Sequence, residues 1–444
     1  MATTYLSRSV SSTGDRQKAT FSVWIKKSAD ATNANVVLQE FTDGTNYFQI
    51  HFPNTDQLQV YEEVGGTPVC QVKTNRLFRD PSGFYNIVVA IDTTQGASAD
   101  RVKVYVNGVQ ETSFATATYP TSSLNMNMNV SGNTQYIGAS YGPTNFINAV
   151  MSAVTWIDGT QEAVTVFGAT DATTGEWKFG SPSATYGTNG FLILNNGNTI
   201  TDQSTNSNDF TLGAGTLTNT EDCPSDVFAT LNPLIKFNSS YSVVLSKGNT
   251  TLNTSTGSTN SNPTPATLGM VTGKYYWETK FEEDLGSGTA YPLTGIMGQN
   301  PSVEGNYLGG YNDSYGYAGW NGTVYNNGGS TGNTAGLSVY TEGDILSIAL
   351  DADNNRLYIY KNGVIQNSGT GIVIPSASTT ALGAWFPAAG DWGDSTHVWS
   401  CNFGNGYFGS TAIASAGTNA SNIGVFEYDV PTGYTALSTK GLNN

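Results

Sequence analysis

The chain has 444 residues, and its 18 basic residues against 34 acidic residues give a formal net charge of −16. This length exceeds one ordinary hydrophobic core and predicts two or three domains. No cluster of lysine and arginine residues is found along the sequence, so nucleic acid and anionic membrane surfaces are excluded as expected partners.

The first half of the chain reads as short β-strands separated by turn residues. Apolar and polar residues alternate, or apolar residues run together, in the four segments 21–26, 47–52, 84–91 and 101–106. Asn107-Gly108 follows the last of them, and Asn-Gly is the strongest short signal for a β-hairpin.

The second half repeats this pattern in segments 275–281, 344–350 and 356–360, and again a strand ends in Asn-Gly, at Asn362-Gly363. Helical periodicity is hard to find over 11 residues or more. Many short strands joined by turns predict an all-β chain of two tandem antiparallel β-sandwiches.

Between the halves the sequence becomes sparse in apolar residues and rich in Asn, Ser, Thr and Gly. The predicted organisation is therefore a first sandwich at 1–180, a polar connecting segment at 181–235 and a second sandwich at 236–444.

Particular motifs add a family resemblance to this pattern. The first half resembles the concanavalin A-like, laminin G-type jelly roll in its segments 5–16, 21–28, 136–139, 151–159, 167–178, 186–191 and 226–234. The second half resembles a SPRY domain, a bent β-sandwich, in 273–281, 343–351, 357–363 and 385–389. The second resemblance implies a binding module that recognises partners through loops at one sheet edge.

The first resemblance extends to tail-fibre and other virion proteins of tailed bacteriophages. It implies a virion surface protein that is made in the host cytoplasm: a tail fibre or receptor-binding component that contacts the host surface or its glycans. A head-attached fibre or decoration protein is the alternative, and a free carbohydrate-binding lectin is the third. Implied partners are other virion proteins and a host surface glycan or protein, with several copies or a homo-oligomer on each particle.

Targeting and redox signals are weak. No basic segment followed by an apolar run marks the N-terminus, and no apolar stretch is long enough to span a membrane, so membrane insertion is not expected. The cysteines Cys70, Cys223 and Cys401 are odd in number and far apart, which favours reduced structural thiols over a disulfide framework.

Catalysis is not expected. The two histidines, His51 and His397, lie in strand-like segments without a Gly-x-Ser-x-Gly turn nearby. Hydrolases with this type of fold commonly carry Glu-x-Asp-x-x-Glu on one strand, and each Glu-x-Asp of this chain breaks that spacing, as at Glu282-Glu283-Asp284.

No cofactor is predicted, with calcium as the one candidate metal. Laminin G-type sandwiches often hold calcium at a loop rim, and aspartates at predicted turns could serve as ligands. The alternative is that they cap their own turns. The aspartates in question are Asp43, Asp92, Asp158 and Asp202.

The predicted ligand-binding residues are aromatic. Segment 307–320 interleaves rings with Gly, Asn and Asp, which suits sugar stacking or a protein contact surface. Packing of alternate tyrosines into an ordinary strand is the competing interpretation. A second candidate is a tryptophan on a Gly/Asp loop. The binding prediction names Tyr311, Tyr315, Tyr317, Trp320 and Trp392.

Overall fold

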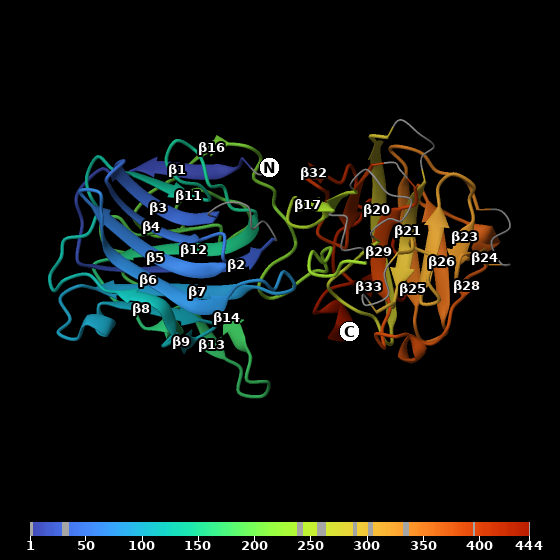
Figure 1. Ribbon diagram of the computed structural model, residues 1–444, viewed down its shortest axis with the longest axis horizontal. Helices are drawn as coiled ribbons and strands as arrows, with labels where there is room; N and C mark the ends of the chain where they lie inside the picture. The colour runs from blue at the N-terminus through green and yellow to red at the C-terminus, as the bar shows by residue number, and fades with distance from the viewer. Residues whose placement is uncertain are drawn as a thin grey trace. The chain divides into compact units, whose positions relative to one another are not determined.

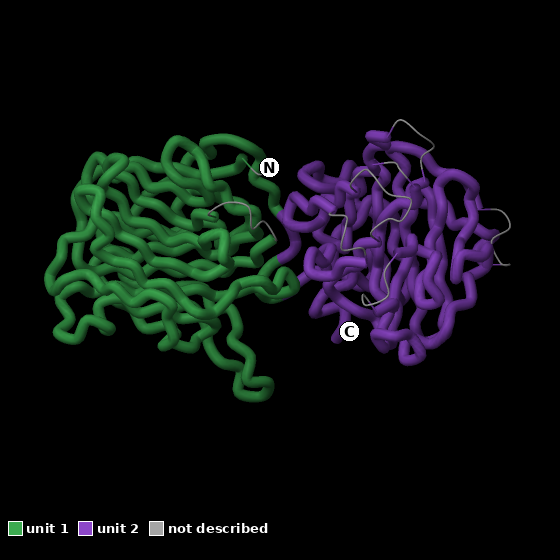
Figure 2. The backbone as a smooth tube through the Cα atoms, in the orientation of Figure 1, with its two compact units in different colours: residues 1–219, 223–225 green, residues 220–222, 226–444 purple. Residues whose placement is uncertain are grey.

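The computed structural model describes residues 3–28, 35–237, 243–254, 263–286, 291–300, 305–331, 337–393 and 396–443. The chain divides into two compact units (Figure 2). Unit 1 comprises Met1–Asn219 and Cys223–Ser225, and unit 2 comprises Thr220–Asp222 and Asp226–Asn444. Each unit is built from antiparallel sheets, which confirms the predicted all-β fold. Within these ranges, no helix is of a length and apolarity to cross a membrane.

Unit 1 contains an eight-stranded sheet in the order β10-β6-β5-β4-β3-β11-β1-β16 and a six-stranded sheet in the order β15-β12-β2-β7-β8-β9 (Figure 1). A small hairpin, β13–β14, completes it. The strands of unit 1 are β1 Tyr5–Ser9, β2 Lys18–Lys27, β3 Asn35–Asp43, β4 Asn46–Phe52, β5 Gln57–Val64, β6 Thr67–Leu77, β7 Tyr85–Asp92, β8 Val102–Val106, β9 Val109–Gln110, β10 Phe114–Thr118, β11 Thr134–Ile137, β12 Ala149–Asp158, β13 Gly168–Thr170, β14 Trp177–Phe179, β15 Phe191–Ile193 and β16 Thr211–Ala214, with 3₁₀ turns η1 Ser98–Asp100 and η2 Val164–Val166.

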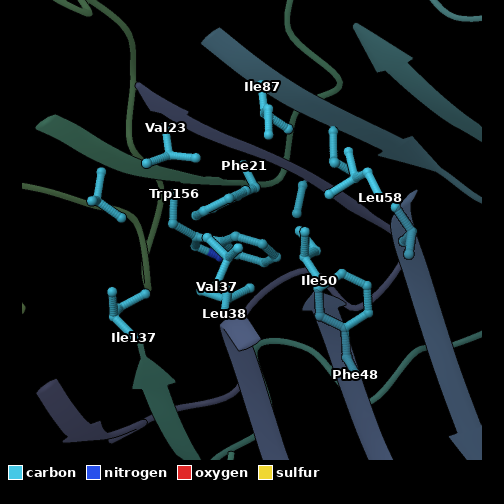
Figure 3. Packing of buried hydrophobic residues seen from close by; sticks show 14 of the residues in the cluster. Phe21, Val23, Val37, Leu38, Phe48, Ile50, Leu58, Ile87, Ile137 and Trp156 are labelled. Atoms are coloured by element: carbon cyan, nitrogen blue, oxygen red, sulfur yellow. The ribbon is translucent and has the colours of Figure 1, made fainter. Parts of the chain in front are cut away.

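The core of unit 1 lies between its two large sheets (Figure 3). Alternation of side chains along β2 determines which residues enter this core. Phe21, Val23 and Ile25 face it, while Trp24 points to the opposite side and packs in a separate cluster with Phe179 of the β13–β14 hairpin. Burying both faces of β2 is why this segment reads as a nearly continuous apolar strand.

One end of the unit 1 core contains buried carboxylates. Glu40 and Glu62 point inward from β3 and β5 and are almost fully buried. Glu40 accepts a hydrogen bond from Val130 N at 2.9 Å, and Glu62 accepts one from Asn127 N at 2.8 Å. These two side chains therefore hold the loop of residues 125–133 over the end of the sandwich.

The segment predicted as a connection, 181–235, is largely part of unit 1. Its β15 pairs with β12, and β16 pairs with β1, so that Leu212 lies opposite Leu6. Residues 181–219 therefore complete both large sheets, and the compact unit continues to Asn219 instead of ending at residue 180. β15 is apolar but only three residues long, and β16 is exposed and carries no apolar pattern, which is why the sequence did not indicate them.

Unit 2 is a second sandwich of a nine-stranded sheet and a six-stranded sheet (Figure 1). The first has the order β17-β18-β30-β20-β25-β26-β27, with β28 on β26 and β33 on β20, and the second has the order β19-β29-β21-β22-β23-β24. The strands are β17 Val244–Ser246, β18 Thr251–Asn253, β19 Thr264–Pro265, β20 Lys274–Asp284, β21 Pro292–Met297, β22 Ser314–Ala318, β23 Val324–Asn326, β24 Gly329–Ser330, β25 Ile345–Asp351, β26 Arg356–Lys361, β27 Val364–Ile365, β28 Ile372–Val373, β29 Phe386–Asp391, β30 His397–Asn402, β31 Tyr407–Phe408, β32 Thr411–Ala412 and β33 Thr435–Ala436, with 3₁₀ turns η3 Asn367–Gly369, η4 Ala377–Thr379 and η5 Gly441–Asn443.

Both predicted Asn-Gly hairpins are present. Asn107 and Gly108 join β8 to β9 with φ of 49° and 78°, and Asn362 and Gly363 join β26 to β27 with φ of 47° and 76°. Two successive positive φ angles define a type I′ turn, whose twist matches that of the flanking strands.

The first and last segments of unit 2 also meet. Ala229 N donates to Leu437 O at 3.0 Å, and β33 pairs with β20 in parallel through Tyr275 and Thr435. The two ends of this unit are therefore fixed to each other by backbone hydrogen bonds.

Candidate functional site

Five aromatic residues of unit 2 form a surface cluster that we call the aromatic patch. Three of them follow or precede neighbouring strands of the six-stranded sheet: Tyr291 precedes β21, Trp320 follows β22 and Trp392 follows β29. Because β21 pairs with both β22 and β29 in antiparallel orientation, the start of β21 and the ends of β22 and β29 meet at one end of the sheet. Tyr307 and Tyr325 complete the patch.

Backbone hydrogen bonds fix the spacing of these strand ends. Trp392 N donates to Tyr291 O at 3.0 Å, and Gly319 N donates to Pro292 O at 3.1 Å. Gly393 then turns the chain with a φ of 97°, and a Cβ atom at this position would lie 3.0 Å from a ring carbon of Tyr291. The turn after Trp392 therefore favours glycine for its conformation, and a Cβ at Gly393 would press against the ring of Tyr291.

The five rings contact one another continuously. The ring centroids of Trp392 lie 5.0 Å from Tyr291, 5.2 Å from Tyr307 and 5.7 Å from Trp320. Trp320 in turn stacks on Tyr325 with an interplanar angle of 20° and meets Tyr291 edge-on at 4.9 Å. Such aromatic pairs contribute roughly 0.5–1.5 kcal/mol each beyond burial, so the patch is preorganised before any ligand arrives.

The aromatic patch is partly accessible and uncharged. Trp392 is 37% exposed, and the other four rings are half-buried. Beneath them lies a small buried cluster that includes Leu293, Met297 and Ala318, which anchors the patch to the sheet. At its rim, Asn321 Nδ2 donates to Tyr325 Oη at 2.7 Å. The patch thus combines apolar ring faces with amide and phenol groups and suits a ligand with both apolar and hydroxyl surface.

The structure places the predicted binding residues in two environments. Trp320 and Trp392 lie together in the aromatic patch. Tyr315 and Tyr317 point into the core between the sheets, and Tyr317 is 1% exposed with its hydroxyl donating to Ser338 O. Tyr311 is also buried, and its hydroxyl accepts a hydrogen bond from Asn306 N at 2.9 Å.

For Tyr311, Tyr315 and Tyr317 the structure therefore supports the packing interpretation over ligand contact. In β22 the residues alternate, so that the tyrosines face the core between the sheets, while Ser314 and Gly316 lie on the opposite side of the strand, where they are also buried. A side chain with this burial cannot contact a ligand without opening the sandwich.

Tyr291, Tyr307 and Tyr325 belong to the aromatic patch but are not among the five named residues, although Tyr307 begins the candidate segment 307–320. Tyr291 and Tyr325 lie outside the strands and the binding segment that the sequence predicts. Bringing them together requires the pairing of strands that are distant in the sequence.

The two histidines occupy strands, as expected. Burial, with a smaller contribution from Lys73, lowers the pKa of His51 to about 4. His397 is fully buried, with its Nδ1 3.5 Å from Asp391 Oδ2 and its Nε2 3.7 Å from Asp284 Oδ1. Neither imidazole lies beside a serine or cysteine nucleophile in the interactions of the described residues.

The calcium candidates cap backbone amides. Asp43 accepts from Thr45 N at 2.8 Å, Asp92 from Thr94 N at 3.0 Å and Asp202 from Ser204 N at 2.9 Å. Asp158 accepts from Asp15 N at 2.8 Å across the unit. Across the described ranges, no three His, Cys, Asp or Glu side chains gather as metal ligands. The hydrogen bonds of these four carboxylates agree with the capping of backbone amides.

Comparison with known families assigns both units. Residues 2–166 match the family of the concanavalin A-like lectin/glucanase superfamily, and residues 274–398 match the SPRY domain. The chain thus carries a concanavalin A-like domain and a SPRY domain in tandem, and both are typically non-catalytic binding domains.

Among solved structures, the SPRY domain of human HERC1 is 19% identical, with 38% of this chain and 96% of that chain covered and a TM-score of 0.31. A human SPRY domain is 18% identical, covering 35% and 93%, with a TM-score of 0.27. The native heptameric SAP-like pentraxin from Limulus polyphemus is 12% identical, covering 44% and 89%, with a TM-score of 0.29. No curated protein matches the chain.

Proposed function

We propose that this chain is a non-catalytic attachment protein on the surface of a tailed-phage particle, as a tail fibre or receptor-binding component, and that the aromatic patch of unit 2 contacts the host surface. The observation that carries this proposal is that five aromatic rings meet where three central strands of the sheet begin or end, with Trp392 the most exposed among them. Exposed contiguous aromatic surface of this kind marks recognition sites.

Charge supports the same proposal. A net charge of −16 repels an acidic cell surface at long range, so attachment must depend on short-range stacking and hydrogen bonding. Contacts of this type are weak singly and become strong when several copies act on one particle. An uncharged aromatic patch supplies the short-range contacts, and several copies of the protein on one virion supply the strength of attachment.

Attachment is tested with the purified, fluorescently labelled chain on host cells. We expect Trp392→Ala together with Trp320→Ala to reduce cell binding at least tenfold, while Val364→Ala, an exposed position on β27, leaves it unchanged. Unchanged binding by the double tryptophan variant would remove the aromatic patch from the proposal.

Location on the particle separates the tail role from the head role. Gold-conjugated antibody against the chain, applied to intact particles, should label the tail. Label on the head instead would favour the head-attached fibre or decoration protein, which shares the same chemistry. A chain found only free of particles would favour a lectin and contradict the virion proposal.

A further inference from the structure

Unit 2 contains a surface hollow of about 440 Å³ that we call the β33 hollow. It lies beside the parallel pairing of β20 with β33, in which Tyr275 is opposite Thr435. Its lining comes from the start of β20, the turn between β25 and β26, and the stretch 420–441. More than half of the lining residues belong to that last stretch, which follows the residues 274–398 that match the SPRY domain. The hollow is therefore built largely by residues outside the matched domain.

Backbone hydrogen bonds fix two sides of the β33 hollow. On one side, Gly273 N donates to Asp353 Oδ1 at 2.8 Å and holds the β25–β26 turn against the start of β20. On the other side, Tyr434 N donates to Pro431 O at 3.0 Å around Gly433, whose φ is 85°. A glycine with positive φ at the third position is the mark of a type II turn. Both sides are thus in place before any ligand binds.

The charged side chains that line the hollow are Lys274 and Asp353. Lys274 Nζ pairs with Asp351 Oδ2 at 2.9 Å, and the pKa of Lys274 is raised mainly by Asp351 and to a smaller degree by Asp353. The ammonium is therefore already neutralised by a buried neighbour. Asp353 is exposed and makes no ion pair with a described residue, and its Oδ1 alone accepts a hydrogen bond from that part of the chain. Two carboxylates against one ammonium leave the hollow negative.

Two tyrosines supply the aromatic part of the lining. Burial raises the pKa of Tyr275 and of Tyr434, so both phenols are neutral and leave the charge of the hollow unchanged. The ring of Tyr434 is half-buried, and Lys274 Nζ lies 5.9 Å from its centroid. A ring in this position attracts cations through its π-electrons. The hollow thus combines an aromatic face with an unpaired carboxylate.

An arginine side chain matches this combination. Its guanidinium group is planar, stacks on aromatic rings and donates hydrogen bonds in a fixed fork that fits a carboxylate. An anionic ligand would meet two carboxylates and an ammonium that is already paired. At longer range, the net charge of −16 attracts a basic partner and repels an acidic one.

We propose that the β33 hollow binds an arginine side chain of a partner protein, with the guanidinium group at Asp353 and against the ring of Tyr434. The site is separate from the aromatic patch, and the proposal does not depend on that patch.

Strand β20 shows the separation of the two sites. Phe281 of β20 meets the ring of Tyr340 at 6.3 Å, and Tyr340 Oη donates to Pro292 O at 2.8 Å, directly beside the aromatic patch. Lys274, at the hollow, lies seven residues before Phe281 on the same strand, or roughly 23 Å away at about 3.3 Å per residue. A partner held at the hollow therefore leaves the aromatic patch free.

The test uses the full chain, fluorescently labelled, on an array of capped heptapeptides that have a central arginine and varied flanking residues. The peptide that binds most strongly is then titrated by fluorescence anisotropy. The same peptide with citrulline in place of arginine is the matched ligand, because citrulline keeps the shape of arginine without its charge.

We expect the arginine peptide to bind and its citrulline form to bind roughly tenfold more weakly. Asp353→Asn, which keeps an acceptor for Gly273 N, should weaken binding of the arginine peptide by a similar factor. Glu283→Gln removes the same charge from an exposed position near the other end of β20 and should leave binding unchanged. Lys274→Gln should bind at least as tightly as the parent, because Asp351 then loses its cation.

Absence of binding to every arginine peptide, equal affinity for the citrulline form, or full binding by Asp353→Asn overturns the proposal. Weaker binding by Lys274→Gln contradicts the negative charge assigned to the hollow, and loss of binding in Trp392→Ala would place the peptide on the aromatic patch. Melting temperatures of the variants confirm that they are folded. The attachment proposal fails separately, when the tryptophan variants attach normally to cells.

Discussion

The rings of Trp320 and Trp392 lie 5.7 Å apart, although they follow two strands, β22 and β29, that are not neighbours in the sheet. Strand β21 between them holds both ends in register, and Tyr291 at its start contacts both rings. The accessible and the buried aromatic residues of this sheet should therefore respond differently to truncation.

Trp392→Ala should lower the free energy of unfolding by less than Tyr317→Ala does, because Trp392 is already 37% exposed, although its three ring contacts are lost. Tyr317→Ala should cost roughly 3 kcal/mol or more, because it empties a fully buried site in the unit 2 core. Urea unfolding of both variants measures this difference. Equal losses would mean that the burial assigned to one ring is incorrect.

Burial raises the pKa of Glu62 to about 8, above its ordinary value of 4.5. A carboxyl group whose folded pKa is raised favours its protonated form in the fold. Stability from this group is therefore greatest below pH 4.5, falls as pH rises to 8, and then stays constant. Glu62→Gln, which remains neutral, should be more stable than the parent by a few kcal/mol at pH 9 and similar at pH 4.

Thermal unfolding of unit 1 between pH 4 and pH 9 measures this effect. Glu176→Gln is the control, since Glu176 is an exposed acid of the same unit. If the melting temperatures of Glu62→Gln and the parent change in parallel with pH, the pKa of Glu62 is not raised and its carboxyl group is ionised in the folded protein at neutral pH.

Gly108→Ala should destabilise unit 1 more than Gly65→Ala. Both glycines have positive φ, so both substitutions bear a backbone cost of about 1 kcal/mol. A Cβ at Gly108 would lie 2.4 Å from the indole of Trp177, whereas a Cβ at Gly65 would meet no atom within 4 Å. Melting temperature and tryptophan fluorescence report the displacement of the β13–β14 hairpin; identical melting points would mean that Trp177 moves aside freely.

Fragments 1–219 and 220–444 should each fold, whereas fragment 1–180 should not form a stable unit. The shorter fragment lacks β15 and β16 and leaves the edges of β12 and β1 unpaired. Circular dichroism and solubility of the three fragments are the measurements. A soluble, cooperatively melting 1–180 would show that residues 181–219 are dispensable.

Much of the fold could be predicted from local pattern. Alternation marked the central strands, and the two Asn-Gly pairs marked hairpins whose φ angles are those of the expected turn. Edge strands such as Thr211–Ala214 could not be predicted, because all four residues are exposed and carry no apolar period.

The site was predictable in part. The sequence indicated Trp392 because Gly and Asp around a large ring predict an exposed loop, and Trp320 because it ends a segment that interleaves rings with Gly, Asn and Asp. Alternation alone could not decide which face of β22 meets the core, so Tyr315 and Tyr317 remained candidates. Tyr291 was missed because its role depends on strand pairs formed by distant segments.

In each unit, backbone hydrogen bonds between an early segment and the last segment of that unit set the order in which the unit can be completed at the ribosome. The edge of β1 opposite β11 stays open until residues 211–214 have left the exit tunnel, and Ala229 cannot bond to Leu437 until that residue has been synthesised. Unit 1 is thus complete while most of unit 2 is still being made. Termination before Leu437 would release a chain with a finished unit 1 and an incomplete, aggregation-prone unit 2.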